Sequence, residues 1–410
     1  MDGIQSSLSR RHLLGGVLGT GILGAGMLAT SHAEETAKQI EGFDQTQTDI
    51  DASQTWQPIS DRKIRMGIVG HGVCQFGLQF SLQNHPNVEL VAVSDLIPDR
   101  CDDMAKQAHC EKTYPSLEEM LKDDSIEAIF LATDAPSHAR QAIDVLNHGK
   151  HVASAVPCCF GSIEDGERLF EAVKKNRGLN YMMFETSAFH DDCYAMRQIY
   201  QAGGFGKLVY MEGEYYHWCP TPIDSYKGWR DGSPPLWYPT HATGYYCCVS
   251  GGAFTEVSCM GMLSHLPYLQ EGKNRYNNRF GTESAMMRTT EGGMARIIMS
   301  KDTPGFYAEA GRVRGERGSY YGSFQGTDEA TQLVNSLNLR KPALPPQVDA
   351  GGHGGSHGYL GNEFVESILE ERRPFVDITM ALHLTVCGIV ANQSALHDGE
   401  LMKIPQYVMD

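Results

Sequence analysis

The sequence predicts an α/β protein with a doubly wound parallel sheet, followed by an α+β domain with a large, mostly antiparallel open sheet. Two observations predict it. Strand-like and helix-like segments alternate over residues 62–184, which is typical of a parallel sheet with helices on both faces. In residues 185–410, strand-like runs rich in tyrosine and β-branched residues predominate, as in antiparallel sheets.

The first of these domains has five strand candidates. We expect the strands at residues 64–69, 88–94, 126–132, 151–154 and 180–184. We expect helices at about 72–84, 100–108, 116–121, 138–147 and 163–176. The third helix has Ser116 and Glu119 at the spacing of a capping box.

The second domain opens with a helix at 190–201 and closes with helices at about 359–371 and 378–397. Between them we expect strands at 208–216, 254–260, 284–290, 295–300 and 312–315. Residues 340–358 are rich in Pro and Gly and predict a long flexible loop.

The amino-terminal segment is typical of an export signal. Arg10-Arg11 precedes a Gly/Leu/Ala run over 13–29, and Ser31-His32-Ala33 has the small-x-small pattern of a cleavage site. Residues 1–33 therefore predict a twin-arginine signal peptide, in preference to a retained membrane anchor, and export to the periplasm. Residues 34–61 predict a flexible linker. We expect no later stretch that is long and apolar enough to cross a membrane.

The formal net charge of −16 argues against nucleic acid and membrane surfaces as partners. It suits a neutral ligand, or an anionic one held in a local basic pocket. The eleven cysteines follow no disulfide framework and show no zinc-type spacing. We therefore expect small buried thiols and no metal site.

A glycine-rich turn, Gly70-His71-Gly72-Val73, follows the first strand and opens a helix. In this context the pattern predicts a dinucleotide site, because glycines let the backbone approach a pyrophosphate closely. The third glycine of the usual motif is replaced by Gln75. Asp95 ends the second strand, where a carboxylate binds ribose hydroxyls and repels a 2′-phosphate. NAD is therefore expected, and NADP is disfavoured.

Over residues 62–400 the chain resembles the glucose-fructose oxidoreductase and inositol dehydrogenase (Gfo/Idh/MocA) family. The resemblance lies in Met66–Gly72, Val91–Asp95, Ala132–His138 and Gly149–Val152. It implies an NAD(P)-binding Rossmann domain, a cofactor cleft lined by Thr133, Pro136 and His138, and a homo-oligomer, dimer or tetramer. In that family a Glu-Lys-Pro triplet follows the fourth strand; here Ala155-Val156-Pro157 keeps only Pro157.

Three motifs in the second half resemble the NAD-dependent α-N-acetylgalactosaminidases, which also lack that lysine. They are Tyr215-Tyr216-His217, Trp237–Gly244 and Gly352–Gly355. The resemblance implies that Tyr238 and His241, with Tyr215 and His217, carry the chemistry, and it leaves the substrate open.

The residues themselves support the pair Tyr238 and His241. Pro239 is well placed in the first turn of a helix, which puts the two side chains one turn apart on the same side. Both can carry protons, and histidine titrates near neutral pH. The alternative is a core tyrosine with a satisfied core histidine. Trp237, Arg230 and His353 are candidate sugar contacts. The alternatives are that Trp237 is a core aromatic residue, that Arg230 is an ordinary surface charge, and that His353 lies in a mobile loop.

These residues and the resemblance together imply an exported enzyme that transfers hydride between a sugar carbon, we expect C3, and tightly bound NAD. Two versions remain open: redox-neutral cleavage of a glycoside by oxidation, elimination, addition and reduction, and a net sugar dehydrogenase that recycles its cofactor. A third alternative is a non-catalytic dinucleotide-binding protein.

Overall fold

The computed structural model of the chain describes residues 56–409. The predicted signal peptide and residues 34–55 of the linker lie outside this range. Residues 56–63 contain no helix or strand, and the first strand begins at Ile64.

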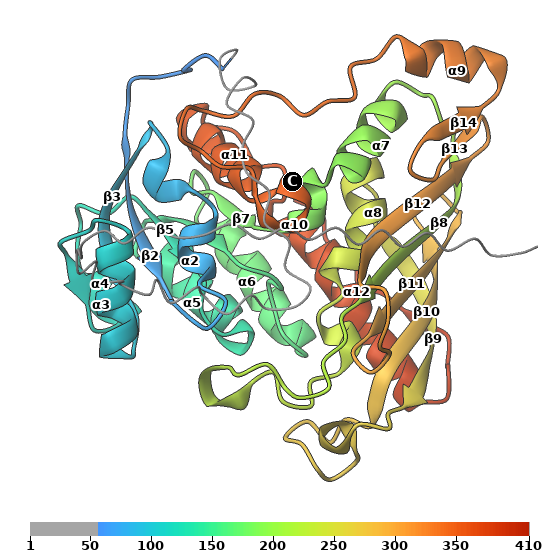
Figure 1. Cartoon of the computed structure of the whole chain (residues 1–410), viewed down its shortest axis with the longest axis horizontal. Helices are drawn as coiled ribbons and strands as arrows, with labels where there is room; N and C mark the ends of the chain where they lie inside the picture. The colour runs from blue at the N-terminus through green and yellow to red at the C-terminus, as the bar shows by residue number, and fades with distance from the viewer. Residues whose placement is uncertain (1–55, 410) are drawn as a thin grey trace, which may run out of the picture. The chain divides into compact units, whose positions relative to one another are not determined.

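The expected parallel sheet is present and has six strands in the order β4-β3-β2-β5-β6-β7, one more than the five expected, because the two-residue strand β4 was not predicted (Figure 1). All neighbouring strands are parallel. The strands are β2 (Ile64–Val69), β3 (Val88–Ser94), β4 (Thr113–Tyr114), β5 (Ala128–Leu131), β6 (His151–Ser154) and β7 (Tyr181–Met183). The side chains of β5 and β7 are buried throughout, as expected for strands covered on both faces.

The connecting helices begin where the sequence provides capping residues. They are α3 (Pro98–Gln107), α4 (Leu117–Met120), α5 (His138–Asn147) and α6 (Ile163–Lys175). Ser116 Oγ accepts the Glu119 N–H at 3.4 Å, and Ser162 Oγ accepts the Asp165 N–H at 3.1 Å. These hydrogen bonds satisfy amide groups that have no partner within their own helix.

The helix expected from residue 72 to about 84 is wrong in length. The structure has only the short helix α2 (Phe76–Gln79) and one 3-10 turn, η1 (Leu82–Asn84). Gln75 and Ser81, each directly before one of these elements, have φ of 49° and 54°. Left-handed backbone at these positions breaks the helical ladder that the apolar spacing predicted.

The second sheet has eight strands in the order β14-β13-β12-β8-β11-β10-β9-β15. Its pairs are antiparallel except for β8 and β11, which are parallel. The strands are β8 (Leu208–Tyr216), β9 (Phe254–Leu263), β10 (Phe280–Thr289), β11 (Met294–Ser300), β12 (Ala308–Gly315), β13 (Gly318–Tyr320), β14 (Phe324–Gly326) and β15 (Met402–Lys403). The large, mostly antiparallel sheet is therefore confirmed.

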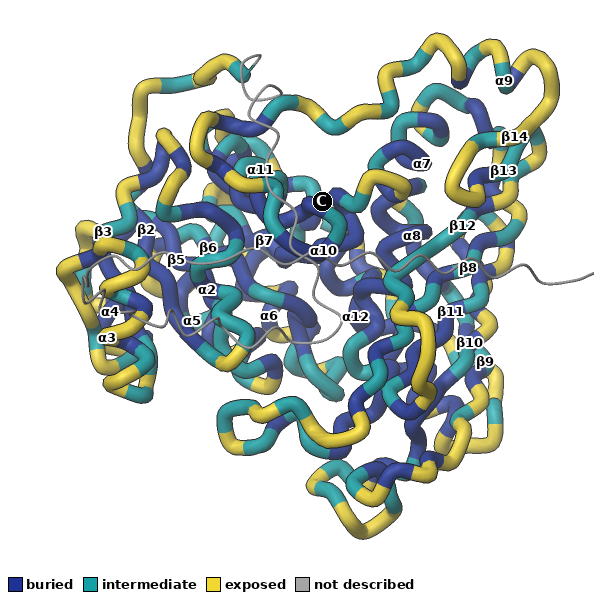
Figure 2. The backbone as a smooth tube through the Cα atoms, in the orientation of Figure 1, coloured by how far each residue is buried: buried dark blue, intermediate teal, exposed yellow. Residues whose placement is uncertain are grey.

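Helices cover one face of this sheet, and burial is concentrated between the helices and the sheet (Figure 2). The helices of this half are α7 (Asp191–Gln201), α8 (Thr240–Ser250), α9 (Asp328–Asn335), α10 (Gly352–Gly355), α11 (His357–Leu369) and α12 (Ile378–Leu396). Helix α8 approaches the sheet closely at Gly213, where a Cβ atom would lie 2.0 Å from the Ala242 carbonyl oxygen. The glycine therefore fixes the depth at which α8 and its first-turn histidine lie.

Two expectations for the carboxyl-terminal part need correction. Helix α12 is long and apolar enough to cross a membrane, with a mean hydropathy of 1.2 over 18 residues, but 83% of that window is buried inside the protein. Its apolar character comes from its place in the core. The predicted loop at 340–358 ends early, because residues from Gly352 onward form α10 and the start of α11. His353 and His357 are buried there, in a packed segment.

Candidate active site

A cavity of about 1110 Å³ lies at the carboxyl ends of β2, β3 and β5. Ligands of doubly wound sheets bind at this edge. Five of the residues predicted to bind the cofactor line it: Gly70, Gly72, Val73, Asp95 and Thr133.

The two glycines of the turn have different roles. Gly70 has φ of 101°, and a Cβ atom there would lie 2.5 Å from the Ala132 carbonyl oxygen. This glycine is required by the protein itself. At Gly72 a Cβ atom would meet no protein atom within 4 Å, so the backbone is open toward the cavity that it lines.

Asp95 closes the cavity beside this turn. Its carboxylate accepts the His71 N–H at 2.7 Å on Oδ2 and the Ile97 N–H at 2.8 Å on Oδ1. Each oxygen keeps a lone pair for a further donor. An open glycine backbone with a positioned carboxylate fits a dinucleotide.

The remaining predicted cofactor residues do not line this cavity. The His71 ring is buried, with Nε2 3.1 Å from Asp103 Oδ2 on α3. His138 is also buried, and its Nδ1 lies 2.9 Å from the Pro157 carbonyl oxygen, its Nε2 3.3 Å from that of Thr133. His138 therefore connects two loops at the sheet edge. Pro136 is exposed beside them.

A second cavity, of about 870 Å³, adjoins the first. Phe76, Trp229 and Arg230 line both cavities, so ligands in the two would meet at these side chains. Six more of the predicted residues and positions line it: Val156, Tyr215, His217, Tyr238, His241 and His353. The valine at the family's lysine position thus faces the reaction space with an apolar side chain.

His241 is held by two buried carboxylates. Its Nδ1 lies 3.0 Å from Glu185 Oε1 and 3.5 Å from Glu309 Oε1, and 3.1 Å from Thr186 Oγ1. Burial alone would lower the pKa of His241, but Glu185 and Glu309 outweigh it and raise this pKa to about 9. At neutral pH His241 is an imidazolium, and Nε2 remains the ring nitrogen that can serve a ligand in the cavity.

Two tyrosine side chains lie against His241. The ring of Tyr238 lies 5.5 Å from it and that of Tyr215 5.1 Å. Burial raises the pKa of Tyr238 to about 12 and that of Tyr215 well above its usual value, so both phenols keep their protons near neutral pH. His217 stacks on Tyr215 at 5.8 Å, and its Nδ1 is 2.9 Å from Cys219 Sγ.

A second histidine, which is neutral, faces His241. The rings of His241 and His353 stack at 5.7 Å, and His353 Nδ1 lies 2.9 Å from His357 Nε2. Burial, reinforced by the neighbouring histidines, lowers the pKa of His353 well below its usual value. The site therefore holds a charged and a neutral imidazole side by side, an arrangement that offers one proton donor and one proton acceptor.

Two predicted substrate contacts have different surroundings. Trp237 lines neither cavity: it packs against Phe160 and Tyr276 at 5.4 and 5.3 Å, and its Nε1 donates to Asn392 Oδ1 at 3.1 Å. It is a core aromatic residue in this structure. Arg230 lies over the Trp229 ring at 4.2 Å, at the junction of the cavities.

Sequence reasoning missed three residues that define this site: Glu185, Glu309 and Lys301. Glu185, Glu309 and His241 offer ligand atoms within 4.8 Å of one another, a composition that could hold a cation. The 3.0 Å contact between His241 and Glu185 makes them a hydrogen-bonded cluster here. A signal for Glu185 existed in the sequence, because it follows the last parallel strand, where catalytic groups gather.

Comparison with known proteins finds a family model, curated relatives and solved structures that resemble this chain. Residues 64–184 match the family model described as "Oxidoreductase family, NAD-binding Rossmann fold". The chain is 27% identical over 228 residues to the alpha-N-acetylgalactosaminidase of Bacteroides fragilis, covering 48% of this chain and 52% of that protein. It is 23% identical over 355 residues to a glycosyl hydrolase family 109 protein of Shewanella sp., covering 77% and 74%.

The scyllo-inositol dehydrogenase of Lactobacillus casei, solved with bound NAD(H) and scyllo-inositol, shares the fold. The two structures superpose with a TM-score of 0.65 and 17% sequence identity, and the alignment covers 83% of this chain and 99% of the dehydrogenase. The chain spans about half the length of the first curated relatives it matches. Residues 64–184 therefore match the NAD-binding Rossmann domain of the Gfo/Idh/MocA oxidoreductase family, and glycosyl hydrolase family 109 proteins are among the curated proteins that the chain resembles.

Proposed function

We propose that this chain is an NAD-dependent enzyme that oxidises a sugar carbon as part of redox-neutral cleavage of a glycoside. The carbon that we expect to be oxidised is C3. The observation that carries this proposal is the shared wall of the two cavities. Phe76, Trp229 and Arg230 line both, so a sugar beside His241 would meet a cofactor bound at the glycine turn. The relatives' activities support the choice of a glycoside.

The cofactor cavity would hold NAD through the open backbone at Gly72 and the carboxylate of Asp95. When bound, NAD accepts a hydride from a carbon that bears a hydroxyl group and can later return it. Val73 and Thr133 line the same cavity.

Side chains of the protein would donate and accept the protons of the reaction. His241, protonated at neutral pH, would donate a hydrogen bond from Nε2 to a sugar oxygen. It would supply a proton to that oxygen when the oxygen departs with the leaving group, or when the carbonyl carbon that bears it takes back a hydride. Tyr238 would donate a second hydrogen bond from its phenol. His353, kept neutral by burial, would accept a proton. Glu185 fixes the orientation of the His241 ring through the 3.0 Å contact.

The test is to purify the protein, measure bound NAD by absorbance and incubate it with aryl glycosides of both anomers. Release of phenol without added NAD, together with exchange of hydrogen at C2 from deuterated water, would support the proposal. Reduction of bound cofactor by free sugars with no phenol release would favour the net dehydrogenase instead. A protein unable to bind NAD at about millimolar concentration, a weak affinity of about −4 kcal/mol, would leave only the non-catalytic binding protein.

We also propose that the chain is exported to the periplasm by the twin-arginine route. Support comes from Arg10-Arg11, the apolar run and the pattern ending at Ala33. Replacing both arginines by lysine should retain the protein in the cytoplasm, and the exported form should begin at Glu34 by mass spectrometry. Export of the lysine variant, or an intact amino terminus, would contradict this proposal.

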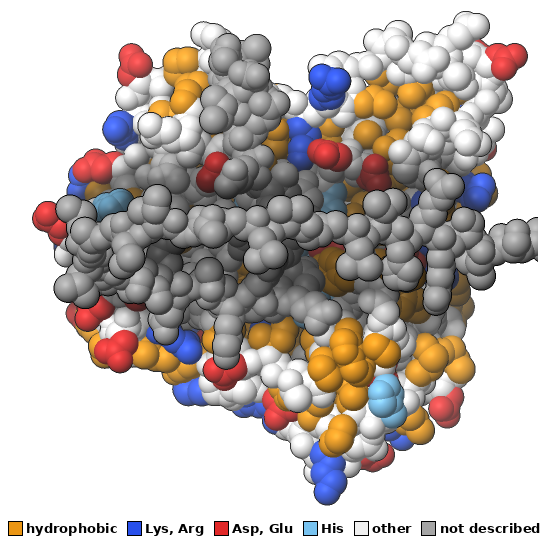
Figure 3. Space-filling model, in the orientation of Figure 1, with side chains coloured by type: hydrophobic (Ala, Val, Ile, Leu, Met, Phe, Trp, Pro, Cys, Tyr) orange, Lys and Arg blue, Asp and Glu red, His pale blue; other side chains and the backbone are white. Residues whose placement is uncertain are grey.

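Finally, we propose a homo-oligomer built on the uncovered face of the eight-stranded sheet. Met260, Met286 and Met294 are 64%, 38% and 45% exposed on neighbouring strands, and Figure 3 shows hydrophobic side chains grouped over the region of β9 and β10. Apolar patches of this kind mark interfaces. Light scattering should show a dimer or tetramer, and Met286→Asp should reduce its mass. A monomeric native protein would refute the interface.

A further inference from the structure

The cavity beside His241 has an unusual balance of charge. None of the aspartates and glutamates in residues 56–409 lines it, whereas Lys301 and Arg230 both do. The adjoining cofactor cavity is lined by four acidic residues, Asp95, Glu118, Asp134 and Asp224. The His241 imidazolium also lines this cavity, but its charge is balanced by Glu185 and Glu309 behind the lining. In a chain with a formal net charge of −16, the two further cations indicate a specific requirement for positive charge.

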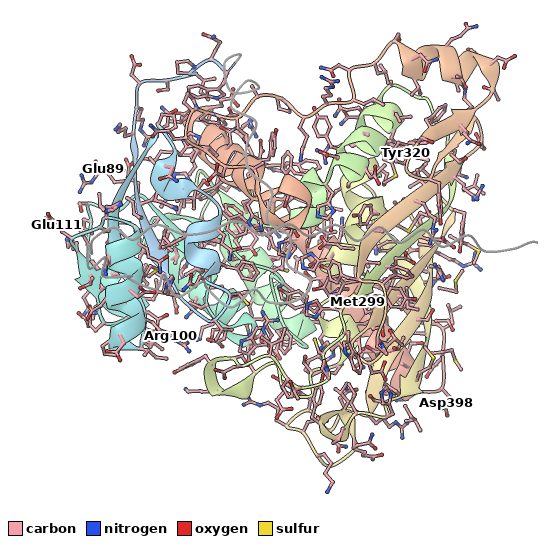
Figure 4. The ribbon with its side chains drawn as sticks, in the orientation of Figure 1. Glu89, Arg100, Glu111, Met299, Tyr320 and Asp398 are labelled. Carbon is pink, nitrogen blue, oxygen red and sulfur yellow. The ribbon has the colours of Figure 1, made fainter. Side chains whose placement is uncertain are left out.

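Lys301 reaches this cavity from the end of β11. Ile297 and Met299 are buried on the helix-covered side of that strand, and Met299, labelled in Figure 4, also lines the cavity. The alternation of side chains puts Lys301 on the same side. Its ammonium group donates to the carbonyl oxygen and to Oγ of Ser233, at 2.8 and 2.7 Å, which leaves one of its three protons for a ligand.

Neither cation is neutralised by the protein. Within residues 56–409, no carboxylate oxygen lies within 4.0 Å of a side-chain nitrogen of Lys301 or Arg230. Glu283, buried behind Lys301, binds the Leu236 N–H and the Asn392 amide instead. A cation held in a partly dry cavity without a counter-ion costs free energy, which an anionic ligand would recover.

We propose that the sugar bound in this cavity carries an anionic group, a carboxylate or a sulfate ester, and that Lys301 with Arg230 binds this group. The inference rests on the proposed function and specifies its substrate class. Lys301 lines the cavity beside His241 and does not line the cofactor cavity. A substitution at Lys301 therefore tests sugar recognition without changing the lining of the cofactor site. Burial lowers the pKa of Lys301 to about 8, a value at which the ammonium form still predominates at neutral pH.

The test is a calorimetric titration of the NAD-loaded protein with two sets of sugars. One set is anionic: glucuronate, galacturonate, glucose 6-sulfate and galactose 6-sulfate. The other is neutral: glucose and galactose. The carboxylates and sulfate esters, taken separately, identify which anion is bound. We expect an anionic sugar to bind about tenfold to one hundredfold more tightly than its neutral counterpart, the usual effect of a charged hydrogen bond.

Lys301→Met should abolish this preference while leaving the content of bound NAD unchanged. Lys175→Met, at an exposed lysine of α6, is the matched control and should preserve it. If the Lys301 variant does not fold, the salt dependence of the native protein decides: raising NaCl from about 0.02 to about 0.3 M should weaken binding of the anionic sugar alone.

Equal binding of neutral and anionic sugars, or a preference that survives Lys301→Met, would overturn this inference and leave the proposed function standing. Failure of every sugar to bind the NAD-loaded protein would overturn both.

Discussion

Glu185 Oε1 lies 3.0 Å from His241 Nδ1, and both side chains are buried. Glu185→Gln should therefore lower the pKa of His241 from about 9, because the nearer of two carboxylates no longer stabilises the imidazolium. An NMR titration of labelled histidine measures the shift. Glu283→Gln, at an equally buried glutamate bonded elsewhere, is the control and should leave the His241 pKa unchanged. An unchanged titration in the Glu185 variant would refute this electrostatic role.

The same pair should make stability depend on pH. The pKa of His241 is raised on folding, so its contribution is complete below the unfolded pKa of about 6.5 and is lost as pH rises through about 9. Denaturant unfolding at several pH values should show the free energy of unfolding of the native protein converging on that of His241→Gln across this window. Parallel curves would contradict the predicted pKa.

His241→Ala should reduce turnover by about 10²-fold or more if His241 moves a proton in the reaction. Retained binding of NAD and of the sugar would show that the loss is chemical. His383→Ala, at a half-buried histidine bonded to the Tyr407 carbonyl oxygen, controls for general effects of removing an imidazole. Full activity of the His241 variant would remove this residue from the mechanism.

The two glycines of the turn should respond differently to alanine. Gly70→Ala should lower stability, because its Cβ would lie 2.5 Å from the Ala132 carbonyl oxygen and the backbone has φ of 101°. Gly72→Ala should leave stability nearly unchanged but weaken the binding of NAD, because the new Cβ would enter the cavity without touching protein. Thermal unfolding and NAD titration separate the two effects. Equal NAD affinity in Gly72→Ala would place the dinucleotide elsewhere.

Trp237→Phe should destabilise the protein without changing sugar affinity. The indole packs between Phe160 and Tyr276 and donates to Asn392, and a buried polar group left without its partner costs about 1–3 kcal/mol. Chemical denaturation gives the first quantity and calorimetry with the bound sugar the second. Weaker sugar binding with unchanged stability would instead indicate that Trp237 contacts the sugar.

The ten strands expected from the sequence are all present, because apolar runs and alternation report directly on burial in a sheet. The four short strands β4, β13, β14 and β15 were missed, because segments of two or three residues are too short to show either pattern. The prediction of one helix after the glycine turn was wrong, because Gln75 and Ser81 have left-handed backbone conformations that interrupt it. Neither residue type indicates that conformation in the sequence. His241 was found through its motif. Its partners were not, since Glu185 and Glu309 lie 56 residues before it and 68 residues after it in the chain. Only the packing of α8 against both β12 and the segment after β7 brings the three together.

All eleven cysteines are free, and ten of them are buried. Burial raises the pKa of several of these thiols, Cys247 and Cys248 among them, well above its usual value. In the native state they are poor nucleophiles and slow to oxidise. An unfolded chain, by contrast, would expose eleven reactive thiols whose random pairing has no native counterpart. The chain should therefore refold efficiently only while its thiols are reduced, so the redox conditions at the place of folding determine the yield of this protein.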